Sequence, residues 1–349
     1  IGACALLAAI HNSMLGFNIF TTIQKMNRHN LFLAMLLVLL TFSASLAYGN
    51  EKPYGLWVME LKQEAISKGI PAGIFDKAML GVVPDPSIIN LDRKQPETRL
   101  SWTQYKRNIV NRDRIDRGRE LMFEHRVLLD EISARYGVPK QIIVALWGVE
   151  TIYGGYTGNS SIIEALATLA YDGRRAELFR AELLAALEII HRHDATREQM
   201  TGSWAGAMGQ TQFMPSSYLK YAVAWDGSGH PDIWTNLPDI FASIANYLHQ
   251  SGWNANQSWG VPVKLPEGFN PADADLYQPR RVEEWKRVGV TRHDGSELPG
   301  SGLAYVMYPG SNSEGAYMVT ENYHILLKWN RSRYFATSVG VLSDKLIAQ

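Results

Sequence analysis

The stretch that most constrains the fold of this chain runs from Pro139 to Tyr156. Pro139 suits the first turn of a helix, where a proline removes no helical hydrogen bond. Apolar residues then recur at three- and four-residue spacing on two faces. A helix that is apolar on nearly every side is buried in a core. The pattern therefore predicts a packed helix that ends at a Gly/Tyr-rich break and carries one acidic residue, Glu150.

The carboxyl of Glu150 can be interpreted in two ways. Carboxylates are rarely buried without a partner, and burial raises their pKa. A raised carboxyl pKa is what a general acid working near neutral pH requires. The alternative is an ordinary glutamate at the exposed end of a core helix. Taken alone, this segment favours the plainer interpretation.

The amino-terminal residues are set aside from the fold. From Met26 the chain has a basic start, an apolar run over residues 31–40 and a small-x-small end at Ala47, which is the pattern of a secretory signal peptide. An uncleaved membrane anchor is the alternative, but the run is short for a spanning helix. We therefore expect residues 1–25 to be an upstream leader outside the natural product, and residues 26–47 to be a signal peptide.

The single cysteine, Cys4, lies in that leader. The remaining chain thus has no thiol for a disulfide, for a cysteine metal site or for a lipid anchor. Lys+Arg and Asp+Glu both number 34, so no net charge draws the protein to nucleic acid. We expect a periplasmic protein that is not lipidated, does not bind nucleic acid and is monomeric.

Along the rest of the chain the pattern is mainly helical. Residues 48–100 form a helical segment that ends in a proline-containing, extended linker over 84–100. Residues 101–261 form a helical core, in which a charged stretch leads into one long helix over 121–136. β-prone runs interrupted by Pro and Gly predict a small β lobe over 262–320. A helix in 321–349 returns to the core, so the predicted fold class is mainly α (α+β).

Several kinds of chemistry find no support in the sequence. The nine histidines show no HExxH motif and no paired ligand spacing. There is no Gly-x-Ser-x-Gly elbow, and the glycines at 202, 206 and 209 lack the lysine of a phosphate-binding loop. We therefore expect no required cofactor and no bound transition metal.

One segment has the spacing of a calcium loop. Oxygen-bearing side chains alternate with glycines from Asp226 to Asp232, and Asp239 follows. However, the twelfth position counted from Asp226 is Leu237, where an EF-hand needs a glutamate. A Gly/Asp-rich surface turn is the preferred interpretation, with bound calcium as the alternative.

Three motifs carry a family resemblance. They are Gly148-Val-Glu150-Thr-x-Tyr153-Gly154, the glycine-rich segment from Gly202 to Ser217, and the segment from Asn322 to Ser332 (Asn-Tyr-x-Ile-x-x-x-Trp-Asn-x-Ser). Together they closely resemble the lytic murein transglycosylase B family, in the same order and over residues 54–349. The resemblance implies a lysozyme-like helical core. It also implies cleavage of the MurNAc–GlcNAc bond of peptidoglycan without water, which leaves a 1,6-anhydro-MurNAc end.

The resemblance also implies roles for individual residues. The glutamate at the position of Glu150 is the single catalytic acid and base of the family. Residues that would line the glycan groove are Tyr105, Arg174, Arg175, Ser203, Gln212, Phe213, Tyr247 and Asn330. The expected partners are peptidoglycan glycan strands, with cell-wall synthases as candidate protein partners.

Each of these assignments has a plainer alternative. Gln212 could brace its loop, Phe213 and Tyr247 could be core residues, and the two arginines could be solvated. The chain also departs from the family in two places. It lacks the lipidated cysteine of some members, and Ala224 replaces the first acidic ligand of the calcium loop that some members have.

The absence of a second acid from these motifs fits one-carboxyl chemistry. Most glycosidases use two carboxylates across the scissile bond, except where the substrate's own N-acetyl group assists. One carboxyl suffices if it first protonates the leaving oxygen and then takes a proton from the sugar's C6 hydroxyl. The rival functions are a muramidase that cleaves the same bond with water, and a non-catalytic wall-binding scaffold.

Overall fold

The computed structural model describes residues 52–94 and 100–348. The predicted leader (1–25) and signal peptide (26–47) lie outside the described residues. The chain divides into two compact units, Ile1–Glu60 and Leu61–Gln349. The described part of the first unit is the beginning of α4 (Tyr54–Ser67), where the rings of Tyr54 and Trp57 stack with centroids 5.6 Å apart.

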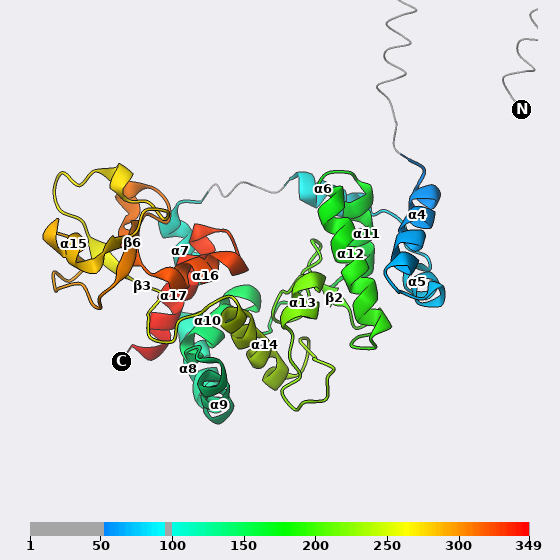
Figure 1. The fold of residues 1–349 in the computed structure, drawn as a ribbon, viewed down its shortest axis with the longest axis horizontal. Helices are drawn as coiled ribbons and strands as arrows, with labels where there is room; N and C mark the ends of the chain where they lie inside the picture. Colours follow the sequence, from blue (N-terminus) through cyan, green and yellow to red (C-terminus); the bar gives the residue numbers. More distant parts are fainter. Residues whose placement is uncertain (1–51, 95–99, 349) are drawn as a thin grey trace, which may run out of the picture. The chain divides into compact units, whose positions relative to one another are not determined.

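The second unit is mainly helical, as predicted (Figure 1). Before the β strands of its lobe come α5 (Ala72–Met79), α6 (Pro86–Arg93), α7 (Trp102–Ile109), α8 (Arg112–Glu124), α9 (Arg126–Tyr136), α10 (Lys140–Thr151), α11 (Ile162–Tyr171), α12 (Ala176–His191), α13 (Pro215–Tyr221) and α14 (Leu237–Gln250). Two short strands, β1 (Ser160–Ser161) and β2 (Thr201–Gly202), pair between these helices.

The helix α10 is the buried centre of this core. Every residue from Ile142 to Gly148 is buried, and the helix packs against α8, α14 and α17. Pro139 precedes it in an extended conformation, and Ile152 ends it in the left-handed region. The predicted packed helix is therefore confirmed, with Glu150 in its last turn.

Two local predictions were wrong. The segment predicted as an extended linker contains α6, because the side chain of Asp85 accepts a hydrogen bond from the backbone N–H of Ser87 at 2.7 Å and Pro86 occupies the first turn. The predicted long helix over 121–136 is two helices, α8 and α9, which meet at His125. Asn111 caps α8, so the charged stretch is itself helical.

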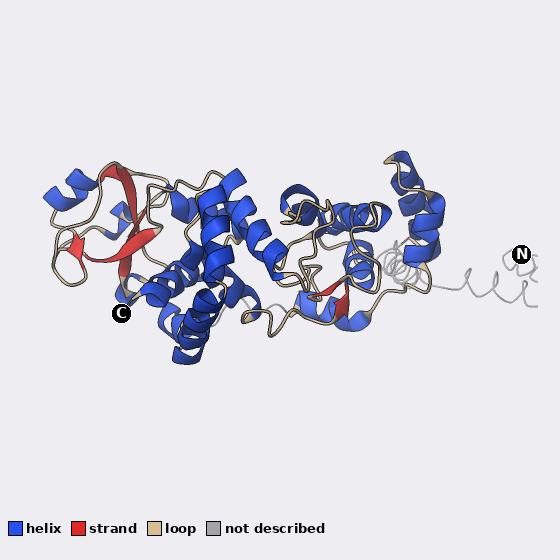
Figure 2. Ribbon diagram, turned by 90° about the horizontal axis from the view of Figure 1, so that it is seen from below, coloured by secondary structure: helices blue, strands red, loops and turns tan. Residues whose placement is uncertain are grey.

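The β-prone runs form an antiparallel sheet with the order β4-β6-β7-β3-β5. Strands are drawn in red in Figure 2. The strands are β3 (Gly260–Lys264), β4 (Arg280–Arg281), β5 (Thr291–Arg292), β6 (Leu303–Met307) and β7 (Ala316–Val319). In the middle of the sheet, Met318 of β7 pairs with Val261 of β3 on one side and with Val306 of β6 on the other. The sequence did not predict α15 (Val282–Arg287), whose Trp285 is fully buried in the small core of this lobe.

After the lobe, the chain returns to the helical core with two helices. α16 (Glu321–Trp329) is followed by α17 (Arg333–Ile347), which packs on α7, α8 and α10. Trp259, next to β3, fits against Gly340 of α17 so closely that a β-carbon there would lie 2.2 Å from its ring. This contact needs a residue without a side chain, and it fixes the start of the lobe to the core.

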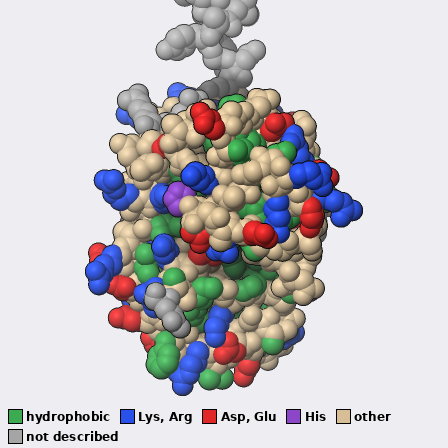
Figure 3. Space-filling view, turned by 90° about the vertical axis from the view of Figure 1, so that its left-hand side faces the viewer, with side chains coloured by type: hydrophobic (Ala, Val, Ile, Leu, Met, Phe, Trp, Pro, Cys, Tyr) green, Lys and Arg blue, Asp and Glu red, His purple; other side chains and the backbone are tan. Residues whose placement is uncertain are grey.

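Charges of both signs are intermixed on the surface. Figure 3 shows Lys/Arg and Asp/Glu side chains scattered over one face, with apolar side chains between them. Over residues 52–94 and 100–348, no helix has the length and apolar character needed to span a membrane.

Candidate active site

A strained turn places Glu150 at the end of α10. Ile152 and Tyr153, with φ of 54° and 57°, both adopt the left-handed region that non-glycine residues avoid. The ring of Tyr153 folds back over the helix, and its hydroxyl donates to the carbonyl of Arg114 at 2.7 Å. A β-carbon on Gly148 would lie 2.5 Å from that ring. The glycine of the first motif is therefore required by the tyrosine of the same motif.

The carboxyl of Glu150 is half-buried and has one specific partner. The indole Nε1–H of Trp329 donates to Glu150 Oε1 at 2.6 Å. Burial raises the pKa of Glu150 to about 7, and the indole hydrogen bond acts in the opposite direction. The carboxyl can therefore gain and lose a proton near neutral pH, which is the requirement for a general acid and base.

An aromatic cluster holds Trp329 in place. Its ring centroid lies 5.2 Å from that of Phe213 and 4.7 Å from that of Tyr247. Phe213 is 3% exposed and Tyr247 is 9% exposed, and the Tyr247 hydroxyl donates to the carbonyl of Lys328 at 2.8 Å. Their burial leaves little ring surface for a sugar and favours the core alternative. Stacking of either ring on a pyranose stays a prediction.

Two predicted groove residues brace the glycine-rich loop. The hydroxyl of Ser203 accepts a hydrogen bond from the backbone N–H of Ala207 at 3.1 Å. The Gln212 amide donates to the carbonyls of Thr157 and Gly209 at 3.0 and 2.9 Å. These contacts agree with the loop-bracing alternative for Gln212, and contact with the substrate stays a prediction for both residues.

Gln210 is a supporting residue that the sequence analysis missed. Its Oε1 accepts from the Trp147 indole at 2.8 Å, and its Nε2 donates to the carbonyl of Trp234 at 2.8 Å. It therefore links α10 to the segment before α14. The signal was present as a second glutamine in the Gly-Gln-Thr-Gln part of the loop motif, but nothing in the sequence told the two glutamines apart.

Arg174 and Arg175 share an acidic partner. Arg174 Nη1 donates to the backbone carbonyl of Asp92 at 3.0 Å, and Arg175 forms an ion pair with the Asp92 carboxylate. The Asp92 residue is fully buried in α6. The arginines are thus not merely solvated, because they tie α6 to the turn before α12. About half of each side chain is still exposed, and contact with substrate carboxylates stays a prediction.

The remaining two predicted residues are Tyr105 and Asn330. Tyr105 is half-buried against Tyr334, with ring centroids 5.4 Å apart. Burial and the nearby charge of Glu150 raise the pKa of Tyr105. Asn330 directly follows Trp329 and is exposed, and its side chain accepts from the backbone N–H of Ser332 at 3.0 Å.

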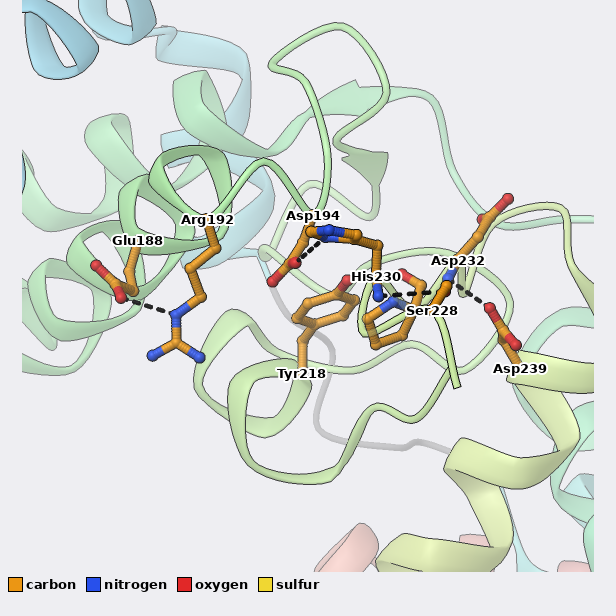
Figure 4. Close-up of polar contacts among 9 residues, drawn as sticks. Glu188, Arg192, Asp194, Tyr218, Ser228, His230, Asp232 and Asp239 are labelled. Carbon is orange, nitrogen blue, oxygen red and sulfur yellow. Dashed lines mark hydrogen bonds and ion pairs between the residues drawn. The ribbon is translucent and has the colours of Figure 1, made fainter. Parts of the chain in front are cut away.

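The loop with calcium-like spacing is closed by hydrogen bonds (Figure 4). Asp239 is 2% exposed, and its two oxygens accept from the backbone N–H groups of Trp225 and Asp232 at 2.8 and 2.9 Å. Asp226 accepts from the backbone N–H of Ser228 at 2.9 Å, and His230 lies 2.9 Å from Asp194.

The carboxylate oxygens of Asp226 and Asp239 accept backbone N–H groups of the same loop, as they do in a surface turn, and bound calcium stays the alternative. Within the described part of the chain, no three His, Cys, Asp or Glu side chains come together as metal ligands. The surface-turn interpretation agrees with this geometry.

The fold and the site define a class of protein. A mainly helical core presents one carboxyl with a near-neutral pKa at the end of its central helix. That arrangement is suited to acid/base cleavage of glycosidic bonds by a lysozyme-like enzyme.

Comparisons with known proteins agree with this class. Residues 54–344 match the model of the transglycosylase SLT domain family. The chain is 30% identical over 262 residues to the membrane-bound lytic murein transglycosylase B of Escherichia coli (strain K12), covering 70% of this chain and 67% of that protein.

The chain is also similar to solved structures of lytic transglycosylases. SltB3 from Pseudomonas aeruginosa, in complex with NAG-NAM-pentapeptide, is 40% identical with a TM-score of 0.82, covering 86% of this chain and 81% of that chain. The Escherichia coli lytic transglycosylase Slt35, in complex with calcium, is 27% identical with a TM-score of 0.72, covering 86% of this chain and 94% of that chain.

The chain therefore belongs to the SLT-domain transglycosylase family, and its activity is that of a peptidoglycan lytic transglycosylase. The resemblance inferred from the three motifs is confirmed.

Proposed function

We propose that this enzyme cleaves the MurNAc–GlcNAc β-1,4 bond with Glu150 as its only acid and base, and leaves a 1,6-anhydro-MurNAc end. The observation that carries this proposal is the half-buried Glu150 carboxyl, whose pKa of about 7 allows it to act in both forms. The solved relatives support the substrate class, because SltB3 has been captured with NAG-NAM-pentapeptide and with NAG-anhNAM-pentapeptide.

The reaction has two proton transfers through one carboxyl. Protonated Glu150 donates its proton to the glycosidic oxygen as the bond to C1 breaks, and the substrate's N-acetyl oxygen holds the developing charge. The Glu150 carboxylate then takes the proton of the C6 hydroxyl while O6 bonds to C1. Glu150 ends the cycle protonated. The tethered nucleophile replaces water without the entropic cost of recruiting it.

The raised pKa makes both halves of this cycle accessible. At pH 7, a carboxyl of pKa about 7 is protonated about half of the time. A carboxyl with its ordinary pKa of 4.5 would be protonated in roughly 0.3% of molecules at the same pH. The burial of Glu150 therefore increases the population of the reactive acid by roughly two orders of magnitude.

We also propose that the enzyme works on glycan strands in the periplasm. The export signal predicted for residues 26–47 and the murein-degrading activity of the relatives support this location. Arg174, Arg175, Ser203, Gln212, Tyr105 and Asn330 remain the proposed groove residues, with their exposed surfaces available to sugar or peptide stems.

The decisive experiment is digestion of purified sacculi followed by mass spectrometry of the released muropeptides. We expect products that are lighter by one water than the reducing muropeptides made by a hydrolytic muramidase. Recovery of hydrated reducing ends alone would overturn the proposal in favour of the muramidase.

A Glu150→Gln variant tests the acid itself. It should bind sacculi in a pull-down but release no muropeptides, whereas the exposed Glu177→Gln control on α12 should release them normally. Full release by Glu150→Gln would remove Glu150 from the mechanism.

A further inference from the structure

We propose that Trp329 is a positioning residue that directs the catalytic proton to the Oε2 atom of Glu150. This inference rests on the proposed role of Glu150 as acid and base. Its basis is the hydrogen bond between Trp329 Nε1–H and Glu150 Oε1, 2.6 Å long. No feature of the sequence predicted this pair, since Trp329 is only one position of the third motif.

The chemistry of the indole makes the bond one-directional. An indole nitrogen donates a hydrogen bond and cannot accept one. Oε1 must therefore act as the acceptor whether Glu150 is ionised or protonated. In a protonated carboxyl the carbonyl-type oxygen is the better acceptor, so the proton resides on Oε2. Glu150 thus presents its proton, and later its basic lone pair, from one defined oxygen.

The packing around Trp329 keeps this donor in place. The ring lies between Phe213 and Tyr247, at centroid distances of 5.2 and 4.7 Å. Tyr247 is itself tied to the end of α16 by its hydroxyl, which donates to the carbonyl of Lys328. The indole ring is thus confined by neighbours that are nearly fully buried, and it does not need to reorganise when the proton moves.

The same bond sets the balance between the two proton transfers. Burial alone favours the neutral acid, whereas the indole N–H favours the carboxylate. Without the indole hydrogen bond, the buried Glu150 carboxyl would have a higher pKa. More molecules would then carry the proton, but the carboxyl would be a weaker acid toward the substrate. Trp329 opposes that bias and keeps Glu150 able to work in both directions.

The first test is a Trp329→Phe variant, which keeps an aromatic ring and removes the donor. Glutamate labelled with ¹³C at Cδ reports the pKa of Glu150 directly, and the Glu150→Gln variant assigns its signal. We expect the pKa of Glu150 to rise by about one unit, because the variant removes the hydrogen bond that favours the carboxylate. The upper limb of the kcat/KM profile on sacculi should move up in pH by the same amount.

The matched control is Trp234→Phe. Trp234 is also partly buried, but its indole donates to the backbone carbonyl of Thr201 at 3.0 Å. This variant should leave the pKa of Glu150 and the pH profile unchanged. An unchanged Glu150 pKa in folded Trp329→Phe would overturn the proposal.

A second measurement needs no substitution of Trp329. In the unmodified protein, the ¹H and ¹⁵N shifts of the Trp329 indole should titrate near pH 7 together with the Glu150 signal. In Glu150→Gln that titration should be absent. An indole signal that does not respond to pH in the unmodified protein would refute the pairing. These readouts do not depend on activity, so they separate a failure of the Trp329 proposal from a failure of the proposed reaction.

Discussion

At the scale of single residues, the site depends on keeping the Glu150 carboxyl partly buried. Glu150 lies at the end of a buried helix, and Gly148 leaves the space that Tyr153 fills. Burial raises the pKa of this carboxyl, so the free energy of unfolding should fall when the carboxyl ionises.

The first prediction concerns pH and stability. The pKa of Glu150 is about 7 in the folded chain and lies above its ordinary value of 4.5, so the folded state binds this proton more tightly than the unfolded state. Its contribution is therefore fully present below about pH 4.5 and lost as the pH rises through about 7. Glu150→Gln should be more stable than the unmodified protein at pH 8, by about 1–2 kcal/mol, and equally stable near pH 4.5.

Urea denaturation at the two pH values measures this difference. Glu177→Gln, an exposed substitution on α12, should show no such pH-dependent gain. Equal stabilities of Glu150→Gln and the unmodified protein at pH 8 would contradict the expected cost of ionising Glu150.

The second prediction concerns the glycine of the catalytic motif. Gly148→Ala would place a β-carbon 2.5 Å from the Tyr153 ring, so the turn that follows Glu150 must shift. We expect a loss of about 1–3 kcal/mol of unfolding free energy and a marked fall in muropeptide release. Gly73→Ala in α5 is the control, since nothing lies within 4 Å of its position and alanine favours a helix. A Gly148→Ala protein as stable and active as the control would contradict this account.

The residues that the sequence did not reveal have a common feature. Gln210 and Trp329 act on partners 63 and 179 positions away, and Asp92 meets Arg175 across 83 positions. Periodicity and local motifs report on neighbours in sequence, so they identified Glu150 but not the groups that tune it. For Phe213 and Tyr247, the low exposure seen in the structure favours the core alternative over stacking on a sugar, since both rings pack on Trp329.

At the scale of elements, strong local signals predicted the helices well. Within the predicted helical core, α14 has a continuous apolar face and a proline in its first turn. The prolines of residues 84–100 predicted an extended linker, whereas Pro86 begins the helix α6. The short α15 was missed since its six residues are too few for a periodic pattern.

The third prediction tests the loop that precedes α14. The Asp239 carboxylate accepts hydrogen bonds from two backbone N–H groups of this loop. In an asparagine, the side-chain NH₂ would face one of these N–H groups, and that hydrogen bond would be lost. Asp239→Asn should therefore lower the unfolding free energy by about 1–3 kcal/mol. Asp226→Asn should change it little, because that residue is exposed in a local turn. Thermal denaturation in EDTA and in millimolar calcium should give the same midpoint for the unmodified protein.

The opposite pattern would show that this loop does bind calcium. In that case chelation would lower the midpoint of the unmodified protein, and Asp226→Asn would abolish its recovery on adding calcium.

At the scale of the whole molecule, the β lobe is joined to the catalytic core by more than its chain connections. Glu314, in the turn before β7, accepts a hydrogen bond from the backbone N–H of Thr103 at 2.8 Å. That N–H belongs to the first turn of α7, the helix that carries Tyr105. A residue of the lobe therefore stabilises the start of a helix beside the acid.

The fourth prediction follows from this link. The backbone N–H of Thr103 is the main cause that lowers the pKa of Glu314 to about 2. The contribution of Glu314 is thus present above its ordinary pKa of 4.5 and lost as the pH falls toward 2. Glu314→Gln should be less stable than the unmodified protein at pH 7, and the difference should shrink below pH 4 in denaturant titrations. Glu297→Gln, an exposed substitution in the same lobe, should show neither effect.

The distance along the chain between Glu150 and Trp329 has a consequence for the timing of activity. The acid is made 179 positions before its indole partner, and the β lobe is made between them. A chain that is still being synthesised carries the acid without α16 and α17, so the carboxyl lacks the Trp329 donor and α10 lacks the packing of α17. We therefore expect the active site to be complete only after the carboxy-terminal helices have folded onto the core.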